Sequence, residues 1–501
     1  MELDFTSQAD YLVALLPEVL LSIWGMVILL MGVSGSEEEG WEWSRKVGWL
    51  TVAGLGTAAA ANGWLYTVVE VGDGSMIAVD PFRLFANWII LLAAVFSVFI
   101  SFAYVARQRL QVAEFYGLIA FSTVGMMLMA AGRDLIVVFL GLEVMSVAVY
   151  ALAALNRRDR KSAEAGLKYF ILGAFSTGFF LYGIALVYGA TGTTDIADIG
   201  AAVTGGAAHS GFLGAGIALL AIGFCFKVAV VPFHMWTPDV YEGSPAPVTA
   251  FMSVSVKAAA FVAFLRVFFV AFQGVYESWW AILWWLAALT MVVANLIALV
   301  QSNVKRMLAY SSIAHAGYLL VAIVALNEIA AAGLLFYLLV YALMNIGAFA
   351  IVITVAGQGE DRLQVEDYSG LGWQQPALGV FLTIFLLSLA GFPGTGGFMG
   401  KIFLLQGAVG GGLRTLAVIL VLTTLLSYWY YLRVAWYMWM QEAPVEDQDR
   451  AVFLPGAMRA ALLVGASLVV LTGVLPGAPL EWAQASVEGL APFTSILGFG
   501  P

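Results

Sequence analysis

The sequence predicts an all-α integral membrane protein of about fourteen transmembrane helices. Hydrophobic residues make up 62% of the 501 residues, and charged residues only 11%. An ordinary soluble domain carries about a quarter charged residues, so this composition cannot place a polar surface around an apolar core. The apolar residues also occur in continuous runs of about 20, the length that a helix needs to cross a bilayer. These observations exclude a soluble enzyme.

Fourteen apolar runs follow one another with little sequence between them. At about 20 residues each they account for roughly 280 residues, so few residues are left for domains outside the bilayer. The 53 glycines allow helices to approach one another closely in lipid. The predicted spans are residues 9–32, 47–69, 84–105, 113–132, 134–155, 164–189, 212–238, 245–271, 279–301, 306–326, 328–355, 377–408, 413–438 and 458–475.

The seventh and twelfth predicted spans are interrupted. Residues 225–234 read CFKVAVVPFH, and residues 391–401 read GFPGTGGFMGK. Each segment combines a helix-breaking Pro or Gly with a lysine. The interruptions lie five spans apart, and five is an odd number, which predicts two five-helix repeats of inverted orientation. The expected division is an N-terminal three-helix segment (1–110), a first repeat with helices 4–8 (111–272), a second, inverted repeat with helices 9–13 (273–440), and helix 14 with a tail (441–501).

The distribution of basic residues predicts the orientation in the membrane. Lys and Arg concentrate in alternate loops, and by the positive-inside rule these loops face the cytoplasm. Both termini are then expected on the outer, periplasmic side. The loops expected in the cytoplasm hold Arg45, Lys46, Arg107, Arg109, Arg157, Arg158, Arg160, Lys161, Lys305, Arg306, Arg362 and Arg450, and those expected outside hold Arg83, Arg133 and Arg414.

Five titratable residues are predicted near the middle of the membrane. Glu143 and His315 lie nine residues into their spans, about 14 Å, and Lys257 lies twelve residues into its own, about 18 Å. Lys227 and Lys401 each flank an interruption. A charge at the bilayer centre costs at least about 2.5–3.5 kcal/mol, so such residues usually serve a function. We expect them to form a horizontal row.

A row of this composition is suited to moving protons. An apolar site removes the hydration of a lysine ammonium, so that the lysine can exchange a proton near neutral pH, and a nearby carboxylate favours the charged form again. Movement of Glu143 relative to Lys227 would therefore switch the lysine between holding and releasing a proton. His315 could relay the proton through water held at the broken helices.

Simpler roles are alternatives for each of these residues. Glu143 and Lys227 could form a static ion pair that fixes helix packing, and Lys257 could extend to the interface as a snorkelling lysine. His315 could equally be a core histidine bonded to a backbone carbonyl. Arg266, near a span end, is interpreted as an interfacial anchor.

The sequence offers no site for a nucleic acid, a metal or a redox cofactor. The net charge of −10 disfavours nucleic-acid binding, which needs a concentrated basic face. The single cysteine, Cys225, cannot form a disulfide framework or an iron–sulfur site. We therefore expect no cofactor-binding residue and no metal ligand in this chain.

One long motif adds a resemblance to a known family. Residues 227–245 read KVAVVPFHMWTPDVYEGSP. This segment resembles the PFHxWxPDxYEGxP signature of the antiporter-like membrane subunits of respiratory complex I, and is most similar to the subunit N family of bacterial NADH-quinone oxidoreductase. Residues 141–143, 168–170, 301–315 and 391–393 agree with it, and the similarity covers essentially the whole chain.

The resemblance implies a proton-translocating membrane subunit with no redox chemistry of its own. It implies a channel in which Glu143 and Lys227 form the ion pair, Lys257 is the connecting lysine and Lys401 the terminal one. NAD, FMN, iron–sulfur clusters and quinone would then belong to partner subunits. The chain would lie in the bacterial plasma membrane beside M-like and K-like neighbours. Alternatives are a subunit of a multisubunit Na+/H+ antiporter and a passive membrane scaffold. Among the sister subunits, subunit M typically has glutamate at the position of Lys401, so this lysine favours subunit N.

Overall fold

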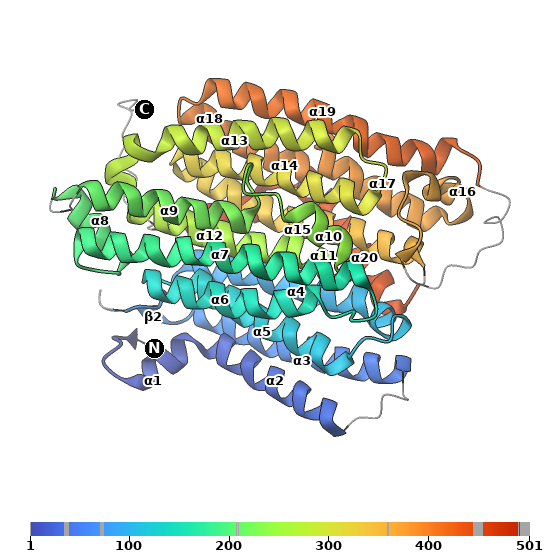
Figure 1. Cartoon of the computed structure of the whole chain (residues 1–501), viewed down its shortest axis with the longest axis horizontal. Helices are drawn as coiled ribbons and strands as arrows, with labels where there is room; N and C mark the ends of the chain where they lie inside the picture. Colours follow the sequence, from blue (N-terminus) through green and yellow to red (C-terminus); the bar gives the residue numbers. More distant parts are fainter. Residues whose placement is uncertain are drawn as a thin grey trace.

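The structure is a bundle of long helices that run roughly along one common axis (Figure 1). This computed structural model describes residues 2–34, 40–70, 75–206, 208, 210–357, 360–443, 454–488 and 490. Within them, the strands β1 (Glu2–Leu3) and β2 (Val69–Glu70) form a two-stranded parallel sheet that pairs Glu2 with Val69 and Leu3 with Glu70. The predicted all-α class is confirmed.

The helices follow one another in the order of the predicted spans. The first group is α1 (Gln8–Ala14), α2 (Leu16–Ser34), α3 (Gly40–Leu65) and α4 (Pro81–Arg107). The second group is α5 (Val112–Ala131), α6 (Leu135–Ala153), α7 (Arg160–Thr191), α8 (Ile196–Thr204), α9 (Ser210–Val228), α10 (Thr237–Gly243), α11 (Ala246–Phe251), the π-helical segment η2 (Met252–Val256) and α12 (Lys257–Val270). The third group is η3 (Gln273–Val275), α13 (Tyr276–Leu299), α14 (Val304–Ala325), α15 (Glu328–Ala356), η5 (Val365–Tyr368), α16 (Leu371–Gln374), α17 (Pro376–Ala390), α18 (Gly396–Gly410), α19 (Arg414–Met440), α20 (Gly456–Val474) and α21 (Gly477–Val487).

Every predicted span overlaps a helix, but the count of fourteen stays a prediction. Among the described residues, twelve helices are long and apolar enough to cross a membrane. Two predicted spans have no counterpart among these twelve. The range 47–69 corresponds to α3, and the range 377–408 is divided between α17 and α18, which have 15 residues each.

Both predicted interruptions are breaks in helices. The seventh predicted span extends too far, because α9 ends at Val228 and α10 begins only at Thr237. Ala229 has a left-handed φ of 63°, and Pro232 has no N–H to donate to a preceding turn. In the twelfth span, α17 ends at Ala390, and Gly391 follows with φ 86°, a conformation that glycine adopts without the steric cost of a Cβ atom.

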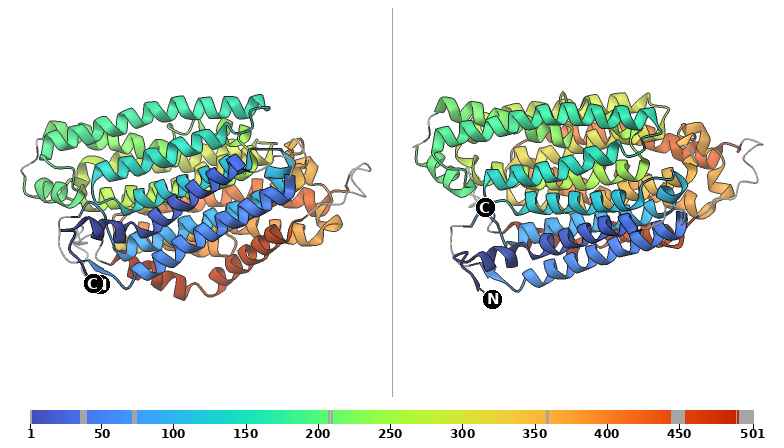
Figure 2. Two further views of the ribbon diagram at one scale, coloured as in Figure 1. Left: turned by 90° about the horizontal axis from the view of Figure 1, so that it is seen from below. Right: turned by 60° about the horizontal axis from the view of Figure 1, so that its bottom comes forward.

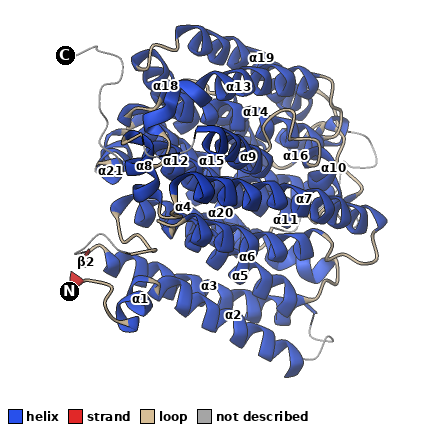
Figure 3. Cartoon of the chain, turned by 60° about the vertical axis from the view of Figure 1, so that its left-hand side comes forward, coloured by secondary structure: helices blue, strands red, loops and turns tan. Residues whose placement is uncertain are grey.

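The most deeply buried helices lie at the centre of the bundle. The apolar stretches of α14 and of the continuous helix Ala246–Val270, which comprises α11, η2 and α12, are buried throughout, and α15 is nearly so. The helices α2 and α19 lie at opposite edges (Figure 3). Seen from the α2 edge, α2 and α3 cross in front of the remaining helices (Figure 2). Lys257 and His315, which lie within these central helices, are therefore shielded from the surroundings of the bundle.

Ion pairs tie the start of α4 to two other helices. Asp80 caps α4 and binds the guanidinium of Arg266 near the end of α12 through two hydrogen bonds of 2.6 and 2.9 Å. Burial raises the pKa of Asp80, but Arg266, the backbone N–H of Arg83 and the charge of Arg133 together lower it more, and the resulting pKa is about 2. Arg83 pairs with Glu18 of α2 at 2.7 Å, and both side chains are buried. Arg266 is thus a structural clamp between α4 and α12 and not only an interfacial anchor.

Candidate functional site

Lys227 lies in the last turn of α9, and its ammonium is held by neutral side chains. It is 1% exposed and donates hydrogen bonds to the Ser146 hydroxyl at 2.7 Å and to the Tyr150 hydroxyl at 3.0 Å, both on α6. The ammonium also lies 5.2 Å from the ring centroid of Tyr150 and 5.9 Å from that of Tyr169. These contacts replace part of the hydration that the ammonium has lost.

Glu143 lies on α6, three residues before Ser146, and binds a different partner. Its carboxylate accepts a hydrogen bond of 2.9 Å from the Thr177 hydroxyl on α7, and its side chain is partly exposed. Among the described residues, no ion pair joins Glu143 to Lys227. A static ion pair is therefore not what the structure contains. Lys227 binds Ser146 instead, and Ser146 lies one turn after Glu143 on the same face of α6.

Lys257 lies where the π-helical segment η2 passes into α12. Its ammonium donates hydrogen bonds of 2.6 Å to both the backbone carbonyl and the hydroxyl of Ser312 on α14, and the residue is 2% exposed. A snorkelling lysine would extend its ammonium to the membrane interface. The structure instead places this ammonium in the centre of the bundle.

His315 lies on α14 between two tyrosine hydroxyls. Its Nδ1 is 2.5 Å from the hydroxyl of Tyr337 on α15, and its Nε2 is 3.1 Å from the hydroxyl of Tyr431 on α19. Tyr431 is also hydrogen-bonded to Ser311. Because hydroxyl groups both donate and accept, each contact can carry a proton in either direction, which a backbone carbonyl could not do. The alternative of a carbonyl-bonded core histidine does not fit this environment.

Lys401 lies in α18 and binds the carbonyl groups that the second break leaves free. Its ammonium donates hydrogen bonds of 3.0 Å to the carbonyls of Leu389 and Ala390, at the end of α17, where no further helical turn supplies N–H groups. The ammonium lies 4.9 Å from the ring centroid of Tyr318 on α14. That ring is 5.5 Å from the ring of His315, so Lys401 and His315 flank one aromatic side chain.

The structure collects the predicted residues into two clusters. Ser312, His315 and Tyr318 lie at spacings of three residues on α14, and they bring Lys257, His315 and Lys401 into one cluster. The other cluster contains Glu143 and Lys227.

A run of aromatic residues lies between the clusters. Tyr169, which neighbours the Lys227 ammonium, stacks on Trp236 with ring centroids 4.3 Å apart, and Trp236 contacts Tyr241 at 6.0 Å. Tyr241 lies on α10, which packs against α14, the helix of Ser312, although the Tyr241 hydroxyl has no hydrogen-bond partner among the described residues. The aromatic run therefore extends from one cluster to the other.

Several polar residues of the site were not predicted from the sequence. Ser146 and Ser312 could have been found, since each lies three residues from a predicted site residue on the same helix. Tyr337 and Tyr431 could not, because they lie on other helices, α15 and α19, and the sequence does not show which face of those helices packs toward His315. Within the part of the chain that the structure describes, no group of three or more His, Cys, Asp or Glu side chains is placed to hold a metal ion.

The fold and the site define a class of protein. A multi-span membrane protein with two broken helices and buried lysines at both breaks corresponds to the antiporter-like membrane subunits. A profile of the family described as "NADH:quinone oxidoreductase/Mrp antiporter, TM" matches residues 132–427. The chain belongs to this family and, within it, to the family of NADH-quinone oxidoreductase subunit N.

Individual relatives support this placement. NADH-quinone oxidoreductase subunit N of Trichlorobacter lovleyi is 48% identical over 479 residues, which cover 95% of this chain and 96% of that protein. A chain of respiratory complex I from Thermus thermophilus, solved with bound aureothin, is 35% identical with a TM-score of 0.79, covering 94% of this chain and 100% of that one. A chain of the archaeal membrane-bound sulfane sulfur reductase is 25% identical with a TM-score of 0.82, covering 96% and 98%.

Proposed function

We propose that this chain moves protons through the membrane as a subunit of a bacterial NADH-quinone oxidoreductase. The observation that carries the proposal is the line of buried groups from Lys227 to Lys401. Each ammonium of this line is partnered inside the protein by hydroxyl groups or carbonyls instead of by a fixed carboxylate. A lysine held in this way can release its proton without breaking a strong ion pair.

The proposed path has three steps. Glu143, the partly exposed carboxylate, exchanges a proton with the Lys227 site along α6 by way of Ser146. The proton then passes to Lys257 past Tyr241, where a water molecule would satisfy the buried unpaired hydroxyl. His315, with a tyrosine on each ring nitrogen, passes it on toward Lys401.

The predicted organisation of the chain is part of the proposal. Residues 111–272 and 273–440 are proposed as the two inverted repeats, flanked by the segments 1–110 and 441–501. The matching breaks after α9 and after α17, each beside a buried lysine, support this division. We propose that the arginine-rich loops around Arg109 and Arg157 face the cytoplasm and that both termini are periplasmic. Arg450, used in the same argument, lies outside the described residues.

The redox chemistry is proposed to take place in other subunits. NAD, FMN, iron–sulfur clusters and quinone would be bound by partner chains, and the nearest partners would be the M-like and K-like membrane subunits. The relatives' name, NADH-quinone oxidoreductase subunit N, supports this placement over a multisubunit Na+/H+ antiporter. The buried ammonium groups of Lys227, Lys257 and Lys401 support it over a passive scaffold, which would gain nothing from them.

The test is to remove the Lys227 ammonium from the assembled complex. In Lys227→Ala we expect NADH oxidation by quinone to continue while proton pumping into reconstituted vesicles falls by about tenfold. The substitution leaves the hydroxyls of Ser146 and Tyr150 without their donor, at a cost of about 1–3 kcal/mol, so the amount of assembled complex is measured first. Lys161→Ala, which removes an exposed lysine, is the control. Normal pumping by a fully assembled Lys227→Ala complex would contradict the proposal.

A further inference from the structure

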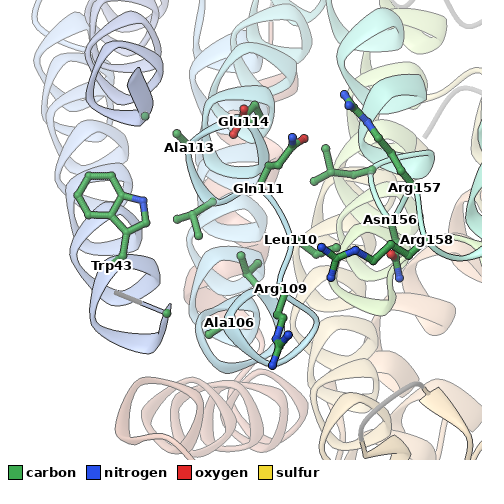
Figure 4. A pocket seen from close by; sticks show the side chains of 15 residues that line it. Trp43, Ala106, Arg109, Leu110, Gln111, Ala113, Glu114, Asn156, Arg157 and Arg158 are labelled. Atoms are coloured by element: carbon green, nitrogen blue, oxygen red, sulfur yellow. The ribbon is translucent and has the colours of Figure 1, made fainter. Parts of the chain in front are cut away.

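A basic cavity lies at the arginine-rich end of the bundle, away from the buried lysines. Its volume is about 640 Å³. Figure 4 shows Trp43 of α3 on one side, the loop between α6 and α7 on the other, and the loop between α4 and α5 between them. The polar and aromatic side chains that line it are Trp43, Arg109, Gln111, Glu114, Asn156, Arg157 and Arg158.

The side chains of the three arginines of this cavity have no hydrogen-bond or ion-pair partner among the residues that the structure describes. Arg109, Arg157 and Arg158 are exposed, and no described residue forms an ion pair or a hydrogen bond with their side chains. Glu114 is the one acidic residue of the described chain that lines the cavity, so positive charge is in excess among the described lining residues. A concave site lined by one sign of charge attracts the opposite sign, and guanidinium groups bind phosphate through paired hydrogen bonds.

An apolar groove begins at the same arginines. Arg157 also lines a second hollow of about 510 Å³ between α6 and α7. The side chains of Val147, Leu167 and Phe170 line this groove and are 54–60% exposed, as is usual for residues that contact lipid. A cationic cavity and an apolar groove that share one residue match a molecule with an anionic head and a hydrocarbon tail.

We propose that these two hollows together bind one anionic phospholipid. The phosphate lies among Arg109, Arg157 and Arg158, Trp43 lies at the level of the headgroup, and an acyl chain follows the groove between α6 and α7. The groove also reaches Tyr150, the residue whose hydroxyl accepts a hydrogen bond from Lys227. The lipid would therefore cover the membrane-facing side of the Lys227 site.

The test counts lipids on the complete complex. Complex in mild detergent is delipidated and titrated with phosphatidylglycerol or with phosphatidylcholine of the same acyl chains, and bound lipid is counted by mass spectrometry of the intact assembly. We expect one phosphatidylglycerol fewer in R157Q/R158Q, with binding about 25-fold weaker, because each basic residue contributes roughly a factor of five. Arg160→Gln, which changes a neighbouring arginine outside the cavity, should bind like the wild type.

Two further arms separate the possible occupants. Glu114→Gln removes the acidic residue of the cavity and should tighten phosphatidylglycerol binding by about fivefold, which keeps the proposal testable if the double variant fails to assemble. Excess inorganic phosphate should not displace the lipid; full displacement would make the cavity a phosphate site and overturn the proposal. Equal binding of phosphatidylcholine would overturn it too. An unchanged lipid count in both R157Q/R158Q and Glu114→Gln would indicate that a neighbouring subunit covers the arginines, and it would overturn the proposal.

Discussion

The two broken helices hold their lysines with different kinds of ligand. At the first break, Lys227 binds hydroxyl groups of Ser146 and Tyr150, which another helix supplies. At the second break, Lys401 binds two backbone carbonyls that the break itself leaves free. Both breaks have the same sequence pattern, an interrupted span with an adjacent lysine. The second break supplies the ligands of its lysine, whereas the first does not.

This difference determines what each lysine can exchange. A hydroxyl group both accepts and donates a hydrogen bond, so Lys227 can pass a proton to the groups that hold it. A carbonyl only accepts, and the negative end of the α17 dipole favours the charged ammonium beside it. If Lys401 exchanges protons as proposed, it must do so with a group other than its present ligands. This predicts a relay site at the first break and a terminal charge carrier at the second.

The comparison is tested most strongly by Lys401→Arg. If Lys401 carries a proton, arginine should reduce pumping by about tenfold or more, because the guanidinium stays protonated throughout the physiological range. If Lys401 only stabilises the carbonyls at the end of α17, arginine should be tolerated, since it keeps the charge and much of the aliphatic chain. Pumping is measured in vesicles with matched amounts of assembled complex. Pumping that is preserved in Lys401→Arg but lost in Lys401→Ala would remove Lys401 from the relay.

The positions of the breaks and of the buried charges could be predicted from the sequence. Runs of apolar residues are long enough to be located one by one, and Pro232 and Gly391 mark the interruptions directly. Depth along a helix follows from a fixed rise of 1.5 Å per residue, and the location of Glu143, Lys257 and His315 near mid-membrane stays a prediction from that rise.

The ligands of these charges could not be predicted. They depend on how far each helix is rotated and on which helices pack together, and a continuously apolar span carries little periodicity that would indicate its rotation. Glu143 illustrates the consequence. The sequence suggested Lys227 as its partner, whereas the packing of α6 against α7 brings Thr177 to the carboxylate.

A smaller effect is expected from the hydroxyl ligands at the first break. Ser146→Ala removes one acceptor of the Lys227 ammonium, and a hydrogen bond to a charged group contributes about 1.5–3 kcal/mol. If this hydroxyl lies on the path, pumping should fall several-fold, and adding Ser146→Ala to Lys227→Ala should cause little further loss. Ser162→Ala, which removes another buried serine hydroxyl bonded to a carbonyl, is the matched control. If the double variant instead lost pumping by the product of the two single losses, the two substitutions would act independently. Ser146 would then not act through Lys227.

The smallest effects concern the backbone at the two breaks. Gly391 has φ 86°, and a Cβ atom there would lie 3.0 Å from Cδ of Lys401, so Gly391→Ala should lower stability by about 1–2 kcal/mol. Ala229 already has a left-handed φ of 63° although it carries a Cβ atom, so Ala229→Gly relieves a similar backbone strain. The substitution also gives the unfolded chain more conformational entropy, which lowers the free energy of unfolding by about 0.5–1 kcal/mol. We expect its net effect to lie near zero. The buried Cys225, the single cysteine of the chain, reports unfolding when its alkylation is followed against temperature by mass spectrometry. A loss of stability in Ala229→Gly as large as that in Gly391→Ala would mean that backbone strain does not distinguish the two breaks.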